Sequence, residues 1–312
     1  MNDIVDEVLK RNQRSIARLI TLVENNDAEA ISLMKNIHRH TGKAHIIGVT
    51  GVMGSGKSSL IFELASAYRK KGKTVGVIAV DPTSPFSGGA LLGDRIRMMD
   101  LATDDGVFIR SMGTRGMLGG LTSAVYDVVE ILDAAGFDVI LVETVGVGQD
   151  EVDIVKVADT TLVVLIPGLG DSIQTIKAGL MEIADIFVVN KADRPGIEQT
   201  VAELESLADL MDSTKHKISI VKTSVKKQKG ITELLDEIQK HLEYLTDNRM
   251  IEIRRRKRYE AELVEIIRKR LMSFIFDEST VESRIDELLN QISKKELDPY
   301  SAAEELLGKI LK

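Results

Sequence analysis

Residues 46–60, IIGVTGVMGSGKSSL, constrain the fold of this chain more than any other stretch. A β-prone apolar run meets a glycine-rich loop that ends in Gly56-Lys57-Ser58, and a helix-forming segment follows. Glycines let such a loop curl until successive backbone N–H groups point at phosphate oxygens, near the positive end of the next helix. The order strand, loop, helix therefore predicts a phosphate-binding loop for a nucleoside triphosphate.

The candidate ligands in this loop differ in chemistry. Lys57 can reach the β and γ phosphates, and the Ser58 hydroxyl is suited to the Mg²⁺ that accompanies them. The full predicted set in the loop is Gly54, Ser55, Gly56, Lys57, Ser58 and Ser59. A chance glycine-rich turn before a helix is the alternative, and it is weaker because both the strand and the helix are present.

Short apolar runs alternate with helix-forming stretches from residue 44 to about residue 224. The runs are 46–50, 74–80, 107–110, 138–143, 161–166, 186–190 and 218–222. Most of them are continuously apolar, which is typical of parallel strands covered by helices on both faces. The pattern predicts a doubly wound, mostly parallel α/β domain of the P-loop NTPase type, with ligands at the carboxyl ends of the strands.

Helical periodicity flanks this α/β region on both sides. We predict an N-terminal helical extension over residues 1–42, a P-loop nucleotide-hydrolase domain over 43–245 and a C-terminal helical region over 246–312. The basic run at 254–258 predicts mainly the solvated face of a helix, with a phosphate or membrane contact as the minor alternative. The apolar stripe beside it suits either the pairing of two subunits or packing on its own domain.

A second motif, Asn190-Lys191-x-Asp193, indicates which base is bound. The Asp193 carboxylate can accept hydrogen bonds from N1–H and the 2-amino group of guanine, whereas adenine presents an acceptor at N1. Lys191 would lay its apolar stem along the base, and Asn190 would tie this loop to the phosphate loop. A helix cap is the alternative, but it explains Asp193 alone. A backbone N–H near Ser224 and Val225 is a further candidate base contact, although a plain strand-to-loop transition explains these residues nearly as well.

Carboxylates near Ser58 are candidates for the Mg²⁺ shell, because this ion prefers oxygen ligands. Asp81 and Glu143 each end a predicted strand, and we expect one of them to orient the attacking water. Asp94 is a third candidate, but a helix start stabilised by the helix dipole explains it equally well. The nearby glycine-rich segments are typical either of solvated loops or of loops that order around the γ-phosphate.

Composition excludes several other classes. The formal net charge of −7 over 312 residues argues against a general nucleic-acid binder, and the absence of cysteine excludes a disulfide scaffold or a thiolate metal site. No apolar run approaches the ~20 residues that a membrane-spanning helix needs. The first residues lack the features of a signal peptide. We therefore expect a cytoplasmic protein with no nucleic-acid or membrane partner.

Four longer blocks resemble the signature sequences of the methylmalonyl-CoA mutase-associated GTPases, a family of G-protein chaperones. The blocks are VDPTSPFSGGALLGDRIRM, FIRSMGTRGMLGGL, FDVILVETVGVGQDEVDI and IPGLGDSIQTIKAGLMEIADIFVVNKAD. The likeness extends from about Arg18 to the terminal DPYSAAEELL. It departs at Met53, where the family usually has proline, at Ser59, where it usually has threonine, and at Leu169, where a smaller residue is usual.

This resemblance implies a homodimeric, Mg²⁺-dependent GTPase that converts GTP to GDP. Such a protein gates the loading of adenosylcobalamin into an acyl-CoA mutase and protects that mutase. Three switch segments would lie at 81–98, 143–153 and 167–179, and Asp171, Gln174 and Lys177 in the third would transmit the presence of the mutase. The implied catalytic residues are Lys57, Asp81, Glu143 and Lys177, and the implied metal ligands are Ser58, Asp81, Asp94 and Glu143.

Two other classes share the phosphate loop. A GTPase that inserts nickel into a metalloenzyme predicts metal segments rich in histidine or cysteine, whereas this sequence has 5 histidines, which are scattered, and no cysteine. A small-molecule kinase or transport ATPase predicts a preference for ATP. A nucleotide-binding measurement distinguishes this last class from a GTPase.

Overall fold

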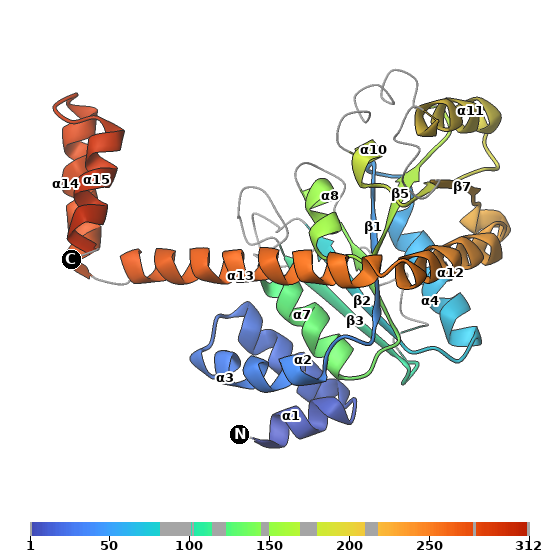
Figure 1. Cartoon of the computed structure of the whole chain (residues 1–312), viewed down its shortest axis with the longest axis horizontal. Coiled ribbons are helices and arrows are strands. Elements are labelled where there is room, and N and C mark those ends of the chain that lie inside the picture. Colours follow the sequence, from blue (N-terminus) through green and yellow to red (C-terminus); the bar gives the residue numbers. More distant parts are fainter. Residues whose placement is uncertain are drawn as a thin grey trace. The chain divides into compact units, whose positions relative to one another are not determined.

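Seven parallel strands form one sheet in the order β3-β2-β4-β1-β5-β6-β7 (Figure 1). The computed structural model describes residues 2–81, 101, 103–113, 123–144, 150–168, 180–209, 218–276 and 279–310. The chain forms two compact units, Met1–Arg258 and Tyr259–Lys312, and the sheet belongs to the first. The predicted doubly wound α/β fold is confirmed.

The strands are short and mostly buried. They are β1 (His45–Gly51), β2 (Val75–Asp81), β3 (Val107–Gly113), β4 (Val139–Glu143), β5 (Thr160–Leu165), β6 (Ile186–Val189) and β7 (Ser219–Lys222). Every residue of β1, β4, β5 and β6 is buried, as expected when helices cover both faces of a parallel sheet. Strands β2 to β4 lie on one side of β1 within the sheet, and strands β5 to β7 lie on the other. In such sheets ligands bind at the carboxyl end of the strand where the order reverses, which in this chain is β1.

Alternate residues of β1 face different layers. Ile47 and Val49 pack in one buried cluster with Leu60 of α4 (Lys57–Lys70) and Leu234 of α12 (Ile231–Asp247). Gly48 faces the other layer, which contains α7 (Ser123–Ala134), the short helix α8 (Asp150–Asp153) and the 3-10 helix η2 (Ile154–Lys156). The helix α11 (Ile197–Ala208) lies beside β6 and β7, and α10 (Leu180–Ile183) precedes β6.

Three short helices precede the sheet and pack on α7 and on one another. They are α1 (Asn2–Leu9), α2 (Gln13–Glu24) and α3 (Ala28–Ile37), followed by the 3-10 turn η1 (His38–His40). The side chains of Asn12 and Asp27 cap the amino ends of α2 and α3. An ion pair between Glu24 and Arg110 joins α2 to β3. The guanidinium of Arg11 lies 5.1 Å from the centre of the Phe137 ring.

The second unit is helical. The helix α13 (Met250–Phe276) begins in the first unit and continues into the second, where α14 (Ser279–Ser293) and α15 (Pro299–Ile310) follow. Leu288 and Ala302 are buried within this unit, and Arg284 pairs with Glu305 across α14 and α15. Among the helices that the structure describes, none combines the length and the apolar character needed to span a bilayer.

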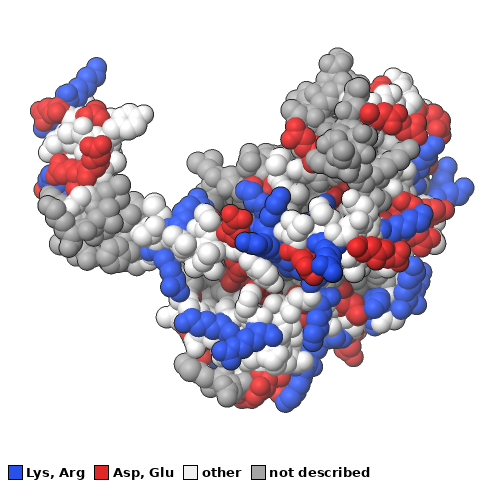
Figure 2. Space-filling model, viewed as in Figure 1, with Lys and Arg blue, Asp and Glu red and all other residues white. Residues whose placement is uncertain are grey.

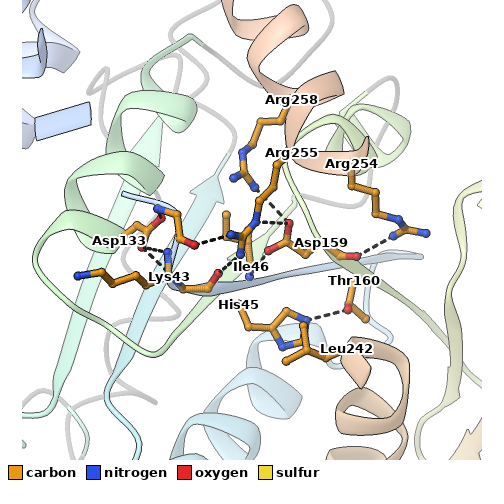
Figure 3. A network of polar contacts seen from close by, with 12 residues as sticks. Lys43, His45, Ile46, Asp133, Asp159, Thr160, Leu242, Arg254, Arg255 and Arg258 are labelled. Atoms are coloured by element: carbon orange, nitrogen blue, oxygen red, sulfur yellow. Dashed lines mark hydrogen bonds and ion pairs between the residues drawn. The ribbon is translucent and has the colours of Figure 1, made fainter. Parts of the chain in front are cut away.

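The prediction that the basic run 254–258 forms a solvated helix face is wrong for three of its residues. Arg254, Arg255 and Arg258 turn inward from the first turns of α13 and bind groups at the amino ends of β1, β5 and β6 (Figure 3). The carboxylates that they neutralise, Asp159 and Asp185, come immediately before β5 and β6. A charge run in the sequence gives no sign of acidic partners so far away along the chain.

Candidate nucleotide-binding site

The phosphate loop connects β1 directly to α4. Gly51, Gly54 and Gly56 have φ angles of 129°, 74° and 91°, a region that glycine adopts far more readily than other residues. A Cβ atom on Gly51 would lie 2.1 Å from the carbonyl oxygen of Val164, and one on Gly56 would lie 2.7 Å from Nδ2 of Asn190. Gly51 and Gly56 are therefore required for both conformation and space, and Gly54 for conformation alone.

The ammonium group of Lys57 is held by the loop itself. Its Nζ donates to the carbonyl oxygens of Gly51 at 2.8 Å and Val52 at 3.3 Å, and the residue is only 6% exposed. No side chain caps the amino end of α4, so its first N–H groups point into the loop. A buried cation beside the positive end of a helix favours an anionic ligand such as phosphate.

A hydroxyl and a carboxylate meet next to this loop. Ser58 Oγ, on the first turn of α4, donates to Glu143 Oε1 at the end of β4 over 2.7 Å. Both groups offer oxygen to a hard cation, and Mg²⁺ in nucleotide sites commonly takes one or two protein oxygens along with phosphate and water. The donor set therefore fits Mg²⁺.

The other predicted metal and catalytic residues are only partly described. Asp81 ends β2, whose Ala79 pairs with Glu143, so the backbone of Asp81 lies at the same edge of the sheet. The side chain of Asp81 lies outside the described part of the structure. Asp94 and Lys177 lie outside the described residues altogether, as do Asp171 and Gln174.

The loop after β6 binds the phosphate loop through two side chains. Asn190 is buried and donates from Nδ2 to the carbonyl oxygen of Ser55 at 2.7 Å, while its Oδ1 accepts a bond from Thr223 Oγ1 at 3.1 Å. Lys191 Nζ donates to the carbonyl oxygen of Gly54 at 2.5 Å. The segment predicted to recognise the base and the one predicted to bind phosphate thus form one connected structure.

The carboxylate of Asp193 is bound by Ser224, which follows β7 in the chain. Ser224 Oγ donates to Asp193 Oδ1 at 2.6 Å, and this hydrogen bond lowers the pKa of the Asp193 carboxyl. The backbone N–H of Ser224 donates to Lys229, so the N–H of Val225, at the start of η3 (Val225–Lys227), is the better candidate for a base contact. The result is an exposed carboxylate acceptor, as guanine recognition requires.

A hollow of about 370 Å³ lies between these loops. Its lining comprises Gly56, Ser59, Asn190, Lys191, Asp193, Arg194, Val225 and Lys226. Six of the eight were predicted from the sequence, whereas Arg194 and Lys226 were missed because their only signal is that each follows a predicted residue. The volume is in the range typical of small-molecule sites.

A parallel α/β sheet with a phosphate loop after β1 and an Asn-Lys-x-Asp loop after β6 defines a P-loop GTPase. Comparison with known families identifies the particular group. The chain belongs to the methylmalonyl-CoA mutase-associated GTPase family, because the model for "Methylmalonyl Co-A mutase-associated GTPase MeaB" matches residues 16–280. The resemblance found in the sequence blocks is thereby confirmed, as is the prediction of a GTPase.

Individual relatives agree with this assignment. A GTPase homologue of Pyrococcus horikoshii is 51% identical over 315 residues, covering 100% of this chain and 98% of that protein. The mitochondrial methylmalonic aciduria type A homolog of Caenorhabditis elegans is 29% identical over 322 residues, covering 96% of this chain and 80% of that protein. The crystal structure of a LAO/AO transport system kinase has a TM-score of 0.72 at 24% identity, with 100% and 97% coverage, and supports the fold.

Proposed function

We propose that this GTPase is a chaperone of an adenosylcobalamin-dependent acyl-CoA mutase, either methylmalonyl-CoA mutase or a close relative. In this proposal GTP hydrolysis gates the loading of adenosylcobalamin into the mutase and protects or reactivates that enzyme. The match of the family model over residues 16–280 is the observation on which the proposal rests, since that family is described as mutase-associated. The cobalamin itself would bind to the mutase.

The proposed nucleotide is GTP, with GDP as the product. The ionised Asp193 would accept from the guanine N1–H and 2-amino groups, and an adenine base would leave that carboxylate unpaired. Asn190 and Lys191 support this by fixing the base loop on the phosphate loop. Val225 and the rest of the 370 Å³ hollow complete the base site.

For hydrolysis, the proposed chemistry is positioning and charge neutralisation. Mg²⁺, held by Ser58 and by Glu143, either directly or through water, would supply charge to the β and γ phosphates. Lys57, whose ammonium already lies inside the loop, would neutralise the transferred phosphoryl oxygens. Glu143 or Asp81 would orient the attacking water, Asp94 would support the metal environment, and Lys177 would respond to the mutase.

The proposal includes a homodimer formed through the C-terminal helices. Within the second unit, α13 exposes a series of large hydrophobic side chains, which are Tyr259, Leu263, Val264, Ile266, Ile267, Leu271 and Met272. Seven such residues on one helix suit a surface that is covered in the assembled protein. Gel filtration and light scattering of the full chain test this part directly.

The proposal includes no nucleic-acid or membrane partner. It places the protein in the cytoplasm, where GTP is available. Acidic and basic side chains are interspersed over the face that Figure 2 shows, whereas a nucleic-acid partner favours a continuous basic surface.

The decisive experiment combines the purified protein with a cobalamin-dependent acyl-CoA mutase. We expect complex formation that differs between GDP and a non-hydrolysable GTP analogue, and GTP hydrolysis that is faster with the mutase than without it. Equal GTP turnover with and without the mutase, together with no complex, would contradict the proposal. Calorimetry with ATP and GTP on the protein alone tests the nucleotide separately: tight ATP binding would favour the kinase or transport ATPase class instead.

A further inference from the structure

The carboxylate of Asp159 is the centre of a buried charge cluster at the edge of the sheet opposite the nucleotide. The residue is fully buried, and its Oδ2 accepts from the backbone N–H of Ile46 at 3.1 Å. Arg258 Nη1 and Arg255 Nε lie 3.4 Å and 3.7 Å from Oδ1 (Figure 3). A buried carboxylate of this kind depends on its cations, because burial removes it from bulk solvent.

Arg258 and a third arginine, Arg254, also bind the backbone around Asp159. Arg258 Nη1 donates to the carbonyl oxygen of Val157 at 3.2 Å, and Arg254 Nη1 donates to the carbonyl oxygen of Asp159 at 2.7 Å. We call Arg254, Arg255 and Arg258 the α13 clamp. The clamp binds Val157 through its backbone and Asp159 through both its backbone and its side chain.

The clamped residues are the end of the connection that crosses from the nucleotide edge to the opposite edge. Glu143, at the end of β4, accepts from Ser58 at the phosphate loop, whereas Asp159 lies just before β5. Between them, α8 and η2 form the described part of the crossing, residues 150–156. Residues 145–149 of this connection lie outside the described part of the structure.

This crossing also lies tightly on β1, the strand that leads into the phosphate loop. A Cβ atom on Gly48 would come within 2.5 Å of Ile154 Cγ1, so the glycine allows η2 to approach the strand closely. The N–H of Asp159 donates to the carbonyl oxygen of Ile46 at 2.8 Å. Residues 154–159 are therefore held between β1 on one side and the α13 clamp on the other.

We propose that the α13 clamp regulates GTP hydrolysis by positioning the crossing segment 150–159. In this proposal the position of α13 and the rate of hydrolysis depend on each other. A well-packed segment with buried charge contacts adopts discrete positions instead of deforming continuously. A displacement of the crossing must therefore either stop at the clamp or move α13. Since α13 continues beyond Arg258 into the second unit, whatever binds there can alter hydrolysis through this contact. The proposal depends on GTPase activity and not on the identity of the partner.

The test compares Arg258→Gln with Arg256→Gln, which removes an equal charge from an exposed position on the same helix. We expect Arg258→Gln to lower the single-turnover rate at saturating GTP about tenfold or more, because a shift of the connection that begins at Glu143 would misplace a residue of the hydrolytic site. GDP affinity should change less than about twofold, because the clamp touches neither the phosphate loop nor the base loop. Arg258→Lys should recover part of the rate, and Arg256→Gln should match the wild type.

Two outcomes with Arg258→Gln would overturn the proposal. One is a wild-type rate in a folded variant, and the other is a loss of rate and GDP affinity in equal proportion, which is the mark of a merely structural role. A measurement on the wild type covers the case in which the variant does not fold. Hydrogen exchange with GDP and with a non-hydrolysable GTP analogue should differ in both 150–159 and 250–258. Identical exchange of residues 250–258 in the two nucleotide states would refute the coupling.

Discussion

The hydroxyl of Ser58 and the carboxylate of Glu143 are joined by a 2.7 Å hydrogen bond, although the two residues belong to different elements, α4 and β4. This bond connects the phosphate loop to the end of a neighbouring strand. It also brings together the two protein oxygens best suited to a divalent cation among the described residues of the site.

Removing the Ser58 hydroxyl should weaken the metal site and leave the guanine contacts in place. We expect Ser58→Ala to raise the Mg²⁺ concentration for half-maximal hydrolysis about tenfold, or ~1.4 kcal/mol. Ser58→Thr retains the hydroxyl and is the matched control. Magnesium titrations of GTP hydrolysis measure the effect, and an unchanged midpoint in Ser58→Ala would remove this residue from the metal site.

Changing the Asp193 carboxylate to an amide should change the preferred base. In Asp193→Asn the side-chain amide donates where the carboxylate accepted, so GTP should bind roughly 100-fold more weakly and xanthosine triphosphate should bind more tightly. Competition against a fluorescent GDP analogue gives both affinities. Ser224→Ala is a useful companion, because it removes only the hydrogen bond that lowers the pKa of Asp193 and should have a smaller effect. Unaltered GTP affinity in Asp193→Asn would refute guanine recognition by this residue.

The elements of the sheet and its two nucleotide loops could be predicted because their signals are local. Buried parallel strands appear as continuous apolar runs, and the phosphate loop needs glycine at positions such as Gly51 and Gly56 for reasons of backbone conformation and space. The sequence also predicted that Asn190 ties the base loop to the phosphate loop, because both loops follow strands at one edge of the sheet. In the structure this link is the hydrogen bond from Asn190 to Ser55.

The charge cluster around α13 could not be predicted in this way. Arg258 and Asp159 are 99 residues apart in the chain, and their pairing depends on where α13 meets the sheet. A run of arginines in a helix usually indicates a solvated face, and in this chain the tertiary structure overrides that tendency. No sequence pattern assigns a role to His45 or His241. In the structure His45 Nε2 and His241 Nδ1 each lie 2.8 Å from Thr160 Oγ1.

The buried His45 should make the protein less stable in mild acid. Burial, with smaller effects from His241 and Arg255, lowers the pKa of His45 from 6.5 to about 3. Below pH 6.5 the unfolded chain binds a proton at this residue that the folded chain does not, so the free energy of unfolding falls as the pH decreases towards about 3. Between pH 6.5 and 5 this amounts to about 2 kcal/mol.

Urea unfolding at pH 7 and pH 5 measures this loss. His45→Gln retains a polar group that can reach Thr160 but does not titrate, and it should lose less stability than the wild type over the same interval. Because other groups also titrate in this range, the informative quantity is the difference between the two proteins. An equal loss in the variant would show that His45 is not the source.

The pair Arg254–Asp185 provides a test of the α13 clamp by stability alone. Two hydrogen bonds of 2.6 and 2.7 Å join these side chains, and His241 Nε2 lies 3.3 Å from the same carboxylate. Burial by itself would raise the pKa of Asp185, but the hydrogen bonds from Arg254 and His241 outweigh it and hold the pKa well below its usual value. The carboxylate is therefore ionised at neutral pH and needs its cation.

Replacing Arg254 with methionine keeps much of the side-chain volume and removes the charge, which leaves the part-buried carboxylate of Asp185 without its guanidinium. We expect a loss of about 3–5 kcal/mol in the free energy of unfolding at pH 7. Arg256 lies two residues further along α13 and is exposed, so Arg256→Met should change stability by less than about 0.5 kcal/mol. The double variant Arg254→Met with Asp185→Asn removes both charges and should regain part of the loss. If Arg254→Met and Arg256→Met unfold at the same urea concentration, Arg254 does not anchor α13 to the sheet.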